Sequence, residues 1–155
     1  MAYTADYLTK GFNYQFRVRA INARGASDAS ASSDLFITAL VPSVPLALDL
    51  VSRGSGTITF KWEAPTDNGG LELTGFKIYI AQGSGEYLEV VSSPTELNPT
   101  ILTYTSTGLT AGLAYKVEVS AFNPIGEGLR TDHIFVFAAD LPQSPVNPPS
   151  VFEFS

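Results

Sequence analysis

The sequence contains no cysteine, and among its 155 residues it has one histidine, one tryptophan and nine lysines and arginines. Without cysteine there is no disulfide, thiolate metal site or cysteine nucleophile, although this absence assigns no cellular compartment. The lysines and arginines are scattered, and the formal net charge is −6. Because phosphate contacts require clustered positive charge, we expect no nucleic acid among the partners.

Long hydrophobic runs are also missing. No stretch approaches the roughly 18 uninterrupted apolar residues of a membrane helix, and the start of the sequence, MAYTADYLTK, lacks the apolar region of a signal peptide. We therefore expect no membrane insertion by this segment. With 45% hydrophobic and only 15% charged residues, the chain is rich enough in apolar side chains to be globular. The low charge favours an extracellular or cell-surface location, with an intracellular filament or cytoskeletal array as the alternative.

The sequence is poor in the convergent polar groups that catalysis requires. His133 has no companion with the spacing of a catalytic triad or a metal pair. Glu63, Asp67 and Glu72 surround one turn and could gather a calcium ion, but a solvated acidic loop is favoured because the EF-hand spacing is absent. The glycine groups GSG and DNGG lack the context of a phosphate loop and are typical of hairpin turns. We therefore predict no catalytic, cofactor-binding or metal-binding residues, no cofactor and no enzyme activity.

Two stretches about 100 residues apart are nearly the same. LTKGFNYQFRVRAINARGAS begins at Leu8, and LTAGLAYKVEVSAFNPIGEG begins at Leu109. An offset of 101 residues also pairs Tyr14 with Tyr115, whereas Pro42 and Pro142 pair at an offset of 100. The chain therefore has an internal repeat of the size of a β-sandwich module.

Apolar and polar residues alternate within each copy, as in a half-buried strand. Similar alternation occurs at residues 57–62 and 76–80, and shorter strand signals occur at residues 87–91, 101–105 and 134–138. Residues rich in proline and glycine separate these stretches, and helix signals are absent. About seven short strands across residues 43–141 predict an all-β fold, an antiparallel sandwich.

Four features occur in order along residues 43–141: Trp62, the turn from Ala64 to Gly70, the corner Leu-x-x-Gly-x-x-Tyr at Leu109–Tyr115 and the strand that runs to Gly126. With these features, residues 43–141 resemble a fibronectin type III domain, which implies a seven-stranded, immunoglobulin-like β-sandwich. We expect one complete module at residues 42–141. Residues 1–41 are expected to be the last three strands of a preceding module, and residues 142–155 a linker and the first strand of a following one. The simplest interpretation is an excerpt of a longer tandem array; a domain-swapped or strand-complemented assembly is the alternative.

The apolar residues of the repeated motif are expected to hold the sandwich together. A tryptophan between two sheets buries a large apolar area, and a corner tyrosine buries its ring while its hydroxyl reaches backbone near Leu109. The predicted structural core comprises Leu8, Tyr14, Trp62, Phe76, Ile78, Leu109, Tyr115, Val117 and Val119.

Binding is the more plausible activity, and loops at one end of the sandwich are its expected place. The candidate protein-contact residues are Asp67, Asn68, Asn123, Pro124, Ile125, Gly126 and Glu127. Expected partners are neighbouring fibronectin type III modules and further, unidentified proteins.

Three functions stay open at this point. The first is a non-catalytic structural or adhesive module of a repetitive protein, which provides spacing, assembly or protein–protein contact. The second is an accessory module of a larger secreted enzyme or of a cell-surface receptor. The third is carbohydrate binding through exposed tyrosines such as Tyr79 and Tyr87.

Overall fold

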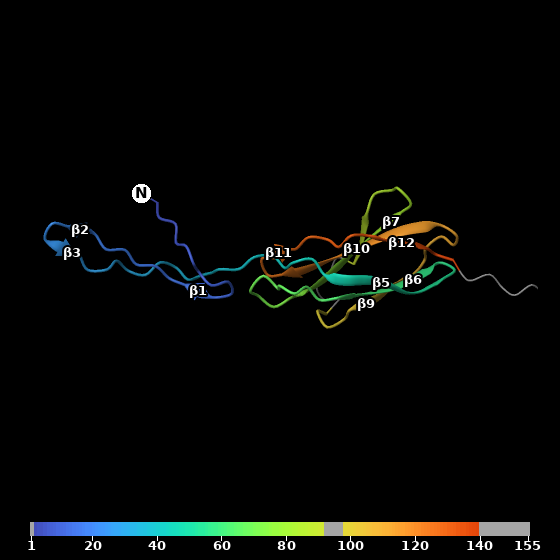
Figure 1. The fold of residues 1–155 in the computed structure, drawn as a ribbon, viewed down its shortest axis with the longest axis horizontal. Helices are drawn as coiled ribbons and strands as arrows, with labels where there is room; N and C mark the ends of the chain where they lie inside the picture. Colours follow the sequence, from blue (N-terminus) through green and yellow to red (C-terminus); the bar gives the residue numbers. More distant parts are fainter. Residues whose placement is uncertain (1, 92–97, 140–155) are drawn as a thin grey trace, which may run out of the picture.

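The structure is a computed structural model that describes residues 2–91 and 98–139. Residues 42–139 form a β-sandwich, which we call the complete module, and residues 2–41, the N-terminal segment, extend from one of its ends (Figure 1). Strands provide the regular structure of these described residues, and none of them belongs to a helix that is long and apolar enough to cross a membrane. The predicted third segment, residues 142–155, lies outside the described residues.

The complete module consists of two antiparallel sheets, which confirms the predicted sandwich. One sheet has the order β5 (Leu46–Gly54), β6 (Thr57–Glu63) and β9 (Thr103–Ser106). The other has the order β11 (Gly126–Glu127), β10 (Ala114–Asn123), β7 (Gly75–Gln82) and β8 (Leu88–Val91). The remaining strand, β12 (Ile134–Phe137), pairs with the start of β10 on the same edge as β11, opposite β7.

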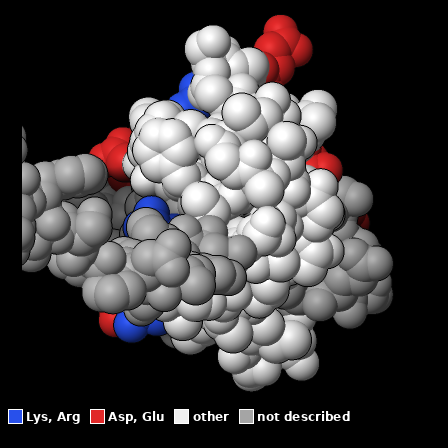
Figure 2. Space-filling view, turned by 90° about the vertical axis from the view of Figure 1, so that its right-hand side faces the viewer, with Lys and Arg blue, Asp and Glu red and all other residues white. Residues whose placement is uncertain are grey.

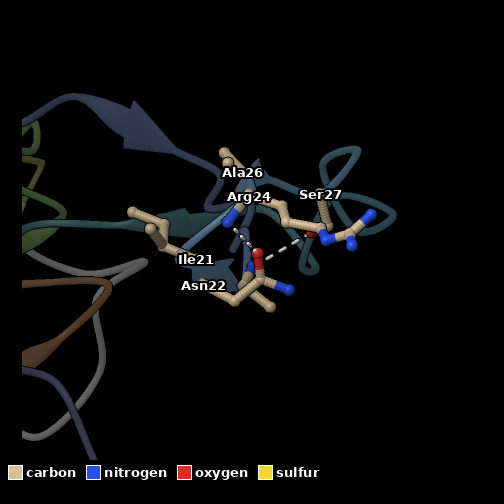
Figure 3. A pocket seen from close by; sticks show the side chains of 7 residues that line it. Ile21, Asn22, Arg24, Ala26 and Ser27 are labelled. Carbon is tan, nitrogen blue, oxygen red and sulfur yellow. Dashed lines mark hydrogen bonds between the residues drawn. The ribbon is translucent and has the colours of Figure 1, made fainter.

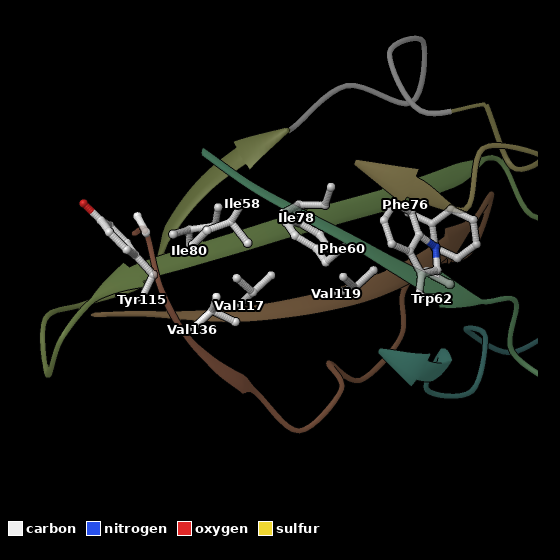
Figure 4. Packing of buried hydrophobic residues seen from close by; sticks show 12 residues of the cluster. Ile58, Phe60, Trp62, Phe76, Ile78, Ile80, Tyr115, Val117, Val119 and Val136 are labelled. Atoms are coloured by element: carbon white, nitrogen blue, oxygen red, sulfur yellow. The ribbon is translucent and has the colours of Figure 1, made fainter. Parts of the chain in front are cut away.

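The core lies between the two sheets because alternate residues of each strand point inward. On β6 these residues are Ile58, Phe60 and Trp62, which are at most 2% exposed. They face the inward side chains of β7 and β10 (Figure 4). The ring of Trp62 packs edge-on against Phe76, with 5.4 Å between the ring centroids. Of the other predicted core residues in this module, Phe76, Ile78, Tyr115, Val117 and Val119 are buried, and Leu109 is partly buried against the same cluster.

Both copies of the repeat form the same corner. The hydroxyl oxygen of Tyr115 accepts the backbone N–H of Thr110 at 2.8 Å. In the first copy, the hydroxyl oxygen of Tyr14 accepts the backbone N–H of Thr9, also at 2.8 Å. The sequence repeat is therefore a repeat of three-dimensional structure.

The N-terminal segment is less regular than the alternation in its sequence predicts. It contains two short antiparallel pairs, β1 (Asn13–Tyr14) with β4 (Phe36–Ile37) and β2 (Ile21–Asn22) with β3 (Gly25–Ala26). Between them, serine side chains replace regular strand pairing. The hydroxyls of Ser27, Ser30 and Ser33 accept the backbone N–H groups of Ala20, Val18 and Phe16. The serines recur every third residue along their strand, whereas the N–H groups that they bind recur every second residue along the other strand. The serine strand therefore has one additional residue at each step, which makes it a series of bulges.

These bulges explain why the offset between the copies changes from 101 to 100. Ser30 and Thr131 occupy equivalent positions, since each hydroxyl accepts the N–H of the equivalent valine. Phe36 and Val136 are also equivalent, because each pairs with the corner tyrosine of its copy. The first copy therefore has one additional residue between these two positions.

The inner face of the N-terminal segment lacks the cover that the complete module provides. Val18 is 71% exposed and Phe16 is 37% exposed, whereas Val119, the equivalent of Val18, is fully buried. The predicted core residues Leu8 and Tyr14 are only half-buried. The described residues thus hold one complete hydrophobic core, which lies in the complete module.

We predict that Trp62→Ala lowers the free energy of unfolding of the complete module by about 3–5 kcal/mol, because it leaves a large cavity between the sheets. Trp62→Phe should cost distinctly less. It retains a ring against Phe76 and loses no hydrogen bond, since the buried indole N–H has no acceptor among the described residues. Equilibrium denaturation of both variants checks the order, and equal losses would contradict it.

Candidate functional site: the junction between the N-terminal segment and the complete module

The predicted contact loops lie at the end of the complete module that faces the N-terminal segment (Figure 1). Asp67 and Asn68 belong to the loop between β6 and β7, and residues 123–127 form the turn between β10 and β11. Both loops contact residues 10–42 of the chain. We call this contact the junction.

Asn123, the last residue of β10, connects three backbone segments at the junction. Its Nδ2 donates to the carbonyl oxygen of Leu40 and to that of Asn68, both at 2.8 Å. Its Oδ1 accepts the N–H groups of Ile125 at 2.9 Å and of Gly126 at 3.3 Å, which closes the turn. The side-chain amide is thus fully hydrogen-bonded, and the residue is only 3% exposed. A buried amide with four partners fixes the position of all the segments that it contacts.

Glycines allow the backbones to approach closely at the junction. A Cβ atom on Gly69 would lie 2.0 Å from the carbonyl oxygen of Leu40, whose N–H donates to the Gly69 carbonyl at 2.9 Å. A Cβ on Gly70 would lie 2.6 Å from the nitrogen of Gly11. Gly69 and Gly70 also have φ angles of 79° and 89°, which other residues rarely adopt. The junction therefore requires glycine for two reasons, space and backbone conformation.

One ion pair crosses the junction, between Lys10 and Asp67. Asp67 Oδ2 binds the ammonium group of Lys10, and Oδ1 accepts the N–H of Gly69 at 2.9 Å. The hydrogen bond from Lys10, followed by that from Gly69, holds the pKa of Asp67 below its ordinary value. The Asp67 carboxylate thus binds both Lys10 of the N-terminal segment and the turn at Gly69 of the complete module.

Glu127 is held within its own module. Its Oε1 accepts hydrogen bonds from the hydroxyls of Tyr79 at 2.7 Å and Ser120 at 2.6 Å, and its Oε2 pairs with Lys77 Nζ at 3.1 Å. Burial raises the pKa of Glu127, but the hydrogen bonds from Ser120, Tyr79 and Lys77 outweigh that effect and leave the pKa below its ordinary value. This carboxylate stabilises the outer face of the sheet. At the tip of the same turn, Pro124 and Ile125 are exposed.

The two tyrosines considered for sugar stacking do not present open rings. Tyr79 is only 5% exposed, and the guanidinium carbon of Arg130 lies 3.5 Å from its ring centroid. Lys116 Nζ lies 5.1 Å from the ring centroid of Tyr87. The hypothesis that Tyr79 is an exposed platform is therefore wrong, because a cation–π contact covers the ring.

The acidic loop has no metal-binding arrangement in the described part of the chain. There, no group of three or more histidine, cysteine, aspartate or glutamate residues is placed to hold a metal ion. Asp67 turns toward Lys10, and Glu63 and Glu72 are exposed. His133 is exposed as well, next to β12.

The first copy has a loop equivalent to the Asn123 turn, and it lines a shallow hollow of about 280 Å³ (Figure 3). Asn22 Oδ1 accepts the N–H of Arg24 at 2.8 Å, as Asn123 does with Ile125. Sequence analysis included Asn123 among the candidate protein-contact residues without naming the atoms that it contacts. The sequence did not predict the hydrogen bonds of the Asn123 amide nitrogen, the ion pair of Lys10, or the close approach at Gly69 and Gly70. These contacts depend on which loops meet in the folded chain.

We predict that Gly69→Ala opens the junction. The new Cβ would collide with the Leu40 carbonyl, so amide exchange at Leu40 should accelerate, and the positive φ should cost the module about 1–2 kcal/mol. Gly108→Ala is the matched control, because Gly108 has a φ of 71° but nothing within 4 Å of its Cβ position. It should destabilise the module similarly and leave exchange at Leu40 unchanged. Equal acceleration in both variants would refute a specific contact.

We also predict that the junction weakens in acid. The pKa of Asp67 is lower in the folded chain than in the unfolded chain, so its contribution is present above the unfolded value and is lost as the pH falls through the folded value. The Gly69 amide resonance should report this titration, since its N–H donates to Asp67. In Lys10→Ala the titration midpoint should move up toward the ordinary value. An unchanged midpoint would show that Lys10 does not affect Asp67.

Comparisons with known proteins agree with the geometry. The family model described as "Fibronectin type III domain" matches residues 43–137. The chain is 36% identical over 129 residues to human myomesin-2, covering 81% of this chain and 8% of that protein. It is 33% identical over 133 residues to exoglucanase B of Cellulomonas fimi, covering 81% of this chain and 11% of that protein. The chain thus spans about a tenth of the length of these relatives.

A solved structure, domains A168–A170 from titin, has a similar fold. The TM-score is 0.61 at 18% sequence identity, and the match covers 77% of this chain and 38% of the titin fragment. This similarity and the two facing sheets show the fold, and the match of the family model to more than half of the sequence establishes the classification. The chain belongs to the fibronectin type III family.

Proposed function

We propose that this chain is a non-catalytic structural segment of a repetitive protein, in which consecutive modules are held in a fixed orientation. The observation that carries the proposal is the junction. A flexible tether would leave the ends of the modules apart, whereas here the backbones at Leu40 and Gly69 meet and Asn123 hydrogen-bonds to the connecting chain. Such contacts favour a stiff connection that transmits orientation from one module to the next.

The N-terminal segment is, in this proposal, the last part of a preceding module. Its corner has the same hydrogen bond as the corner of the complete module. Its inner face carries Phe16 and Val18, which are exposed here but occupy positions equivalent to the buried Val117 and Val119. The missing strands of a sandwich would cover these side chains.

The partner of the predicted contact loops is, accordingly, the neighbouring module. Asp67, Asn68 and Asn123 all interact with residues of the N-terminal segment or with one another at the junction. At the far end of the complete module, charged side chains form only small, separated groups on the face shown in Figure 2. The described residues visible there form no extended patch of one charge, which favours contact with another module over contact with a highly charged ligand.

A second function is favoured by a specific observation, the similarity to exoglucanase B. The module could be an accessory part of a larger secreted enzyme, in which a stiff junction sets the distance between a catalytic domain and another domain. The two functions differ in what the parent protein contains. Further fibronectin type III modules on both sides favour the structural array, and a catalytic domain in the same polypeptide favours the accessory role.

The proposal is tested on a longer fragment that includes the whole preceding module. We predict a narrow distribution of module orientations in small-angle scattering and a common rotational correlation time for both modules by NMR relaxation. Independent tumbling of the two modules would overturn the proposal.

In the same fragment, Asn123→Ala should broaden the orientations. It removes the donor to Leu40 and Asn68 and should lower the free energy of unfolding of the complete module by about 1–3 kcal/mol, because the two carbonyl oxygens lose the buried amide that binds them. Asn98→Ala is the matched control. Asn98 Oδ1 accepts hydrogen bonds only from Thr100 among the contacts of the described residues, so its loss should leave the orientations unchanged. Unchanged orientations in Asn123→Ala would show that this amide does not fix the junction.

A further inference from the structure

The junction contains a bond with distinctive chemistry, the peptide bond between Asn68 and Gly69. Asn68 is the only asparagine in the sequence that is followed by glycine; three of the other five are followed by proline. An asparagine side chain can react with the backbone nitrogen of the next residue, and glycine hinders this attack least because it has no side chain. Proline carries no N–H at this position. The sequence therefore singles out Asn68 for deamidation.

The closed junction restrains both atoms that would react. The nucleophile is the Gly69 nitrogen, whose N–H donates to Asp67 Oδ1 at 2.9 Å. The electrophile is Cγ of Asn68, in the amide whose Oδ1 accepts the N–H of Gly70 at 2.9 Å. The Asn68 carbonyl is also held, by Asn123 Nδ2 at 2.8 Å. Rotation of the Asn68 side chain onto the Gly69 nitrogen requires these hydrogen bonds to break.

The neighbouring segment takes part in this restraint through Lys10. Lys10 binds one oxygen of the Asp67 carboxylate, while the other oxygen accepts the Gly69 N–H. The Leu40 N–H adds a further bond to the Gly69 carbonyl at 2.9 Å. Two residues outside the complete module therefore help to hold the reactive turn closed.

We propose that Asn68 is a spontaneous modification site whose rate of deamidation is controlled by the junction. When the turn opens, the Gly69 nitrogen loses its proton to solvent and attacks Cγ of Asn68. The bond from Cγ to the side-chain nitrogen breaks, ammonia leaves, and a succinimide ring forms. Water then adds to either ring carbonyl and gives aspartate or isoaspartate. The net reaction consumes one water and releases one ammonia. Its rate follows the population of the open turn when opening and closing are fast.

Isoaspartate is incompatible with the closed junction, and aspartate weakens it. Isoaspartate adds a carbon atom to the main chain next to Gly69, where a Cβ would already lie 2.0 Å from the Leu40 oxygen. Aspartate retains an acceptor for the Gly70 N–H but adds a negative charge at the residue next to Asp67, and like charges close together destabilise the charged turn. Once formed, the modification therefore keeps the two segments apart, so that an opening of the junction becomes a lasting change.

The test is peptide mapping by mass spectrometry of the full chain, incubated at neutral pH and physiological temperature. We expect slow deamidation at Asn68 in the folded protein and much faster deamidation in denaturant. Lys10→Ala should accelerate the reaction severalfold in the folded protein, because Asp67 loses its partner across the junction. Lys10→Arg should keep the slow rate. Lys61→Ala, which removes an exposed lysine that forms no ion pair with Asp67, is the matched control and should also react slowly.

Equal rates in the folded and denatured chain, or no effect of Lys10→Ala in a chain that circular dichroism shows to be folded, would overturn the proposal. The consequence is measured separately on the purified isoaspartyl form and on Asn68→Asp. Amide exchange at Leu40 should be faster in both than in the unmodified chain. Unchanged protection at Leu40 would overturn the claim that the modification opens the junction.

Discussion

Strand β10 carries the constraint on which the rest of the structure depends. Its inner residues must be covered by the facing sheet, and both of its edges must find hydrogen-bond partners, which β7 and β12 provide. This strand carries the corner tyrosine, Tyr115, near its start and ends at Asn123, so one element contributes to both ends of the module. The position of Asn123, and with it the junction, follows from the packing of Val117 and Val119 between the sheets.

Much of this architecture could be predicted because it depends on local patterns. Alternation along each strand gave the buried face. The resemblance to a fibronectin type III domain gave Trp62 its structural role, and the repeated motif gave the corner at Tyr115. The junction could not be predicted in the same way. Lys10 and Asp67 are 57 residues apart, and nothing in their local sequence indicates that they pair. The loop DNGG was interpreted as a turn, which is correct locally, but the space that Gly69 provides matters only once Leu40 lies against it.

The irregular pairing in the N-terminal segment has a similar cause. The alternation of Tyr14, Phe16 and Val18 is the same as in β10, yet regular pairing is confined to short pieces. In the complete module, β7 pairs along most of β10 and fixes its geometry, whereas no described residue pairs with the corresponding edge of the first copy. Serine hydroxyls then satisfy the N–H groups on the other side. Alternating apolar and polar residues thus show that a segment can form a strand, but the regularity of that strand depends on pairing with a neighbouring strand.

The copies differ where the modules meet, and these differences show what the junction demands. Lys10 corresponds to Ala111 in the second copy, and Gly128, whose Cβ would lie 2.2 Å from the Pro42 carbonyl oxygen, corresponds to Ser27 in the first. Close packing of Gly69 against Leu40 excludes every side chain at that position, and this steric requirement also places a glycine directly after Asn68. The same glycine that permits a stiff connection therefore creates the reactive bond, and the hydrogen bonds that stiffen the junction are those that keep the bond from reacting.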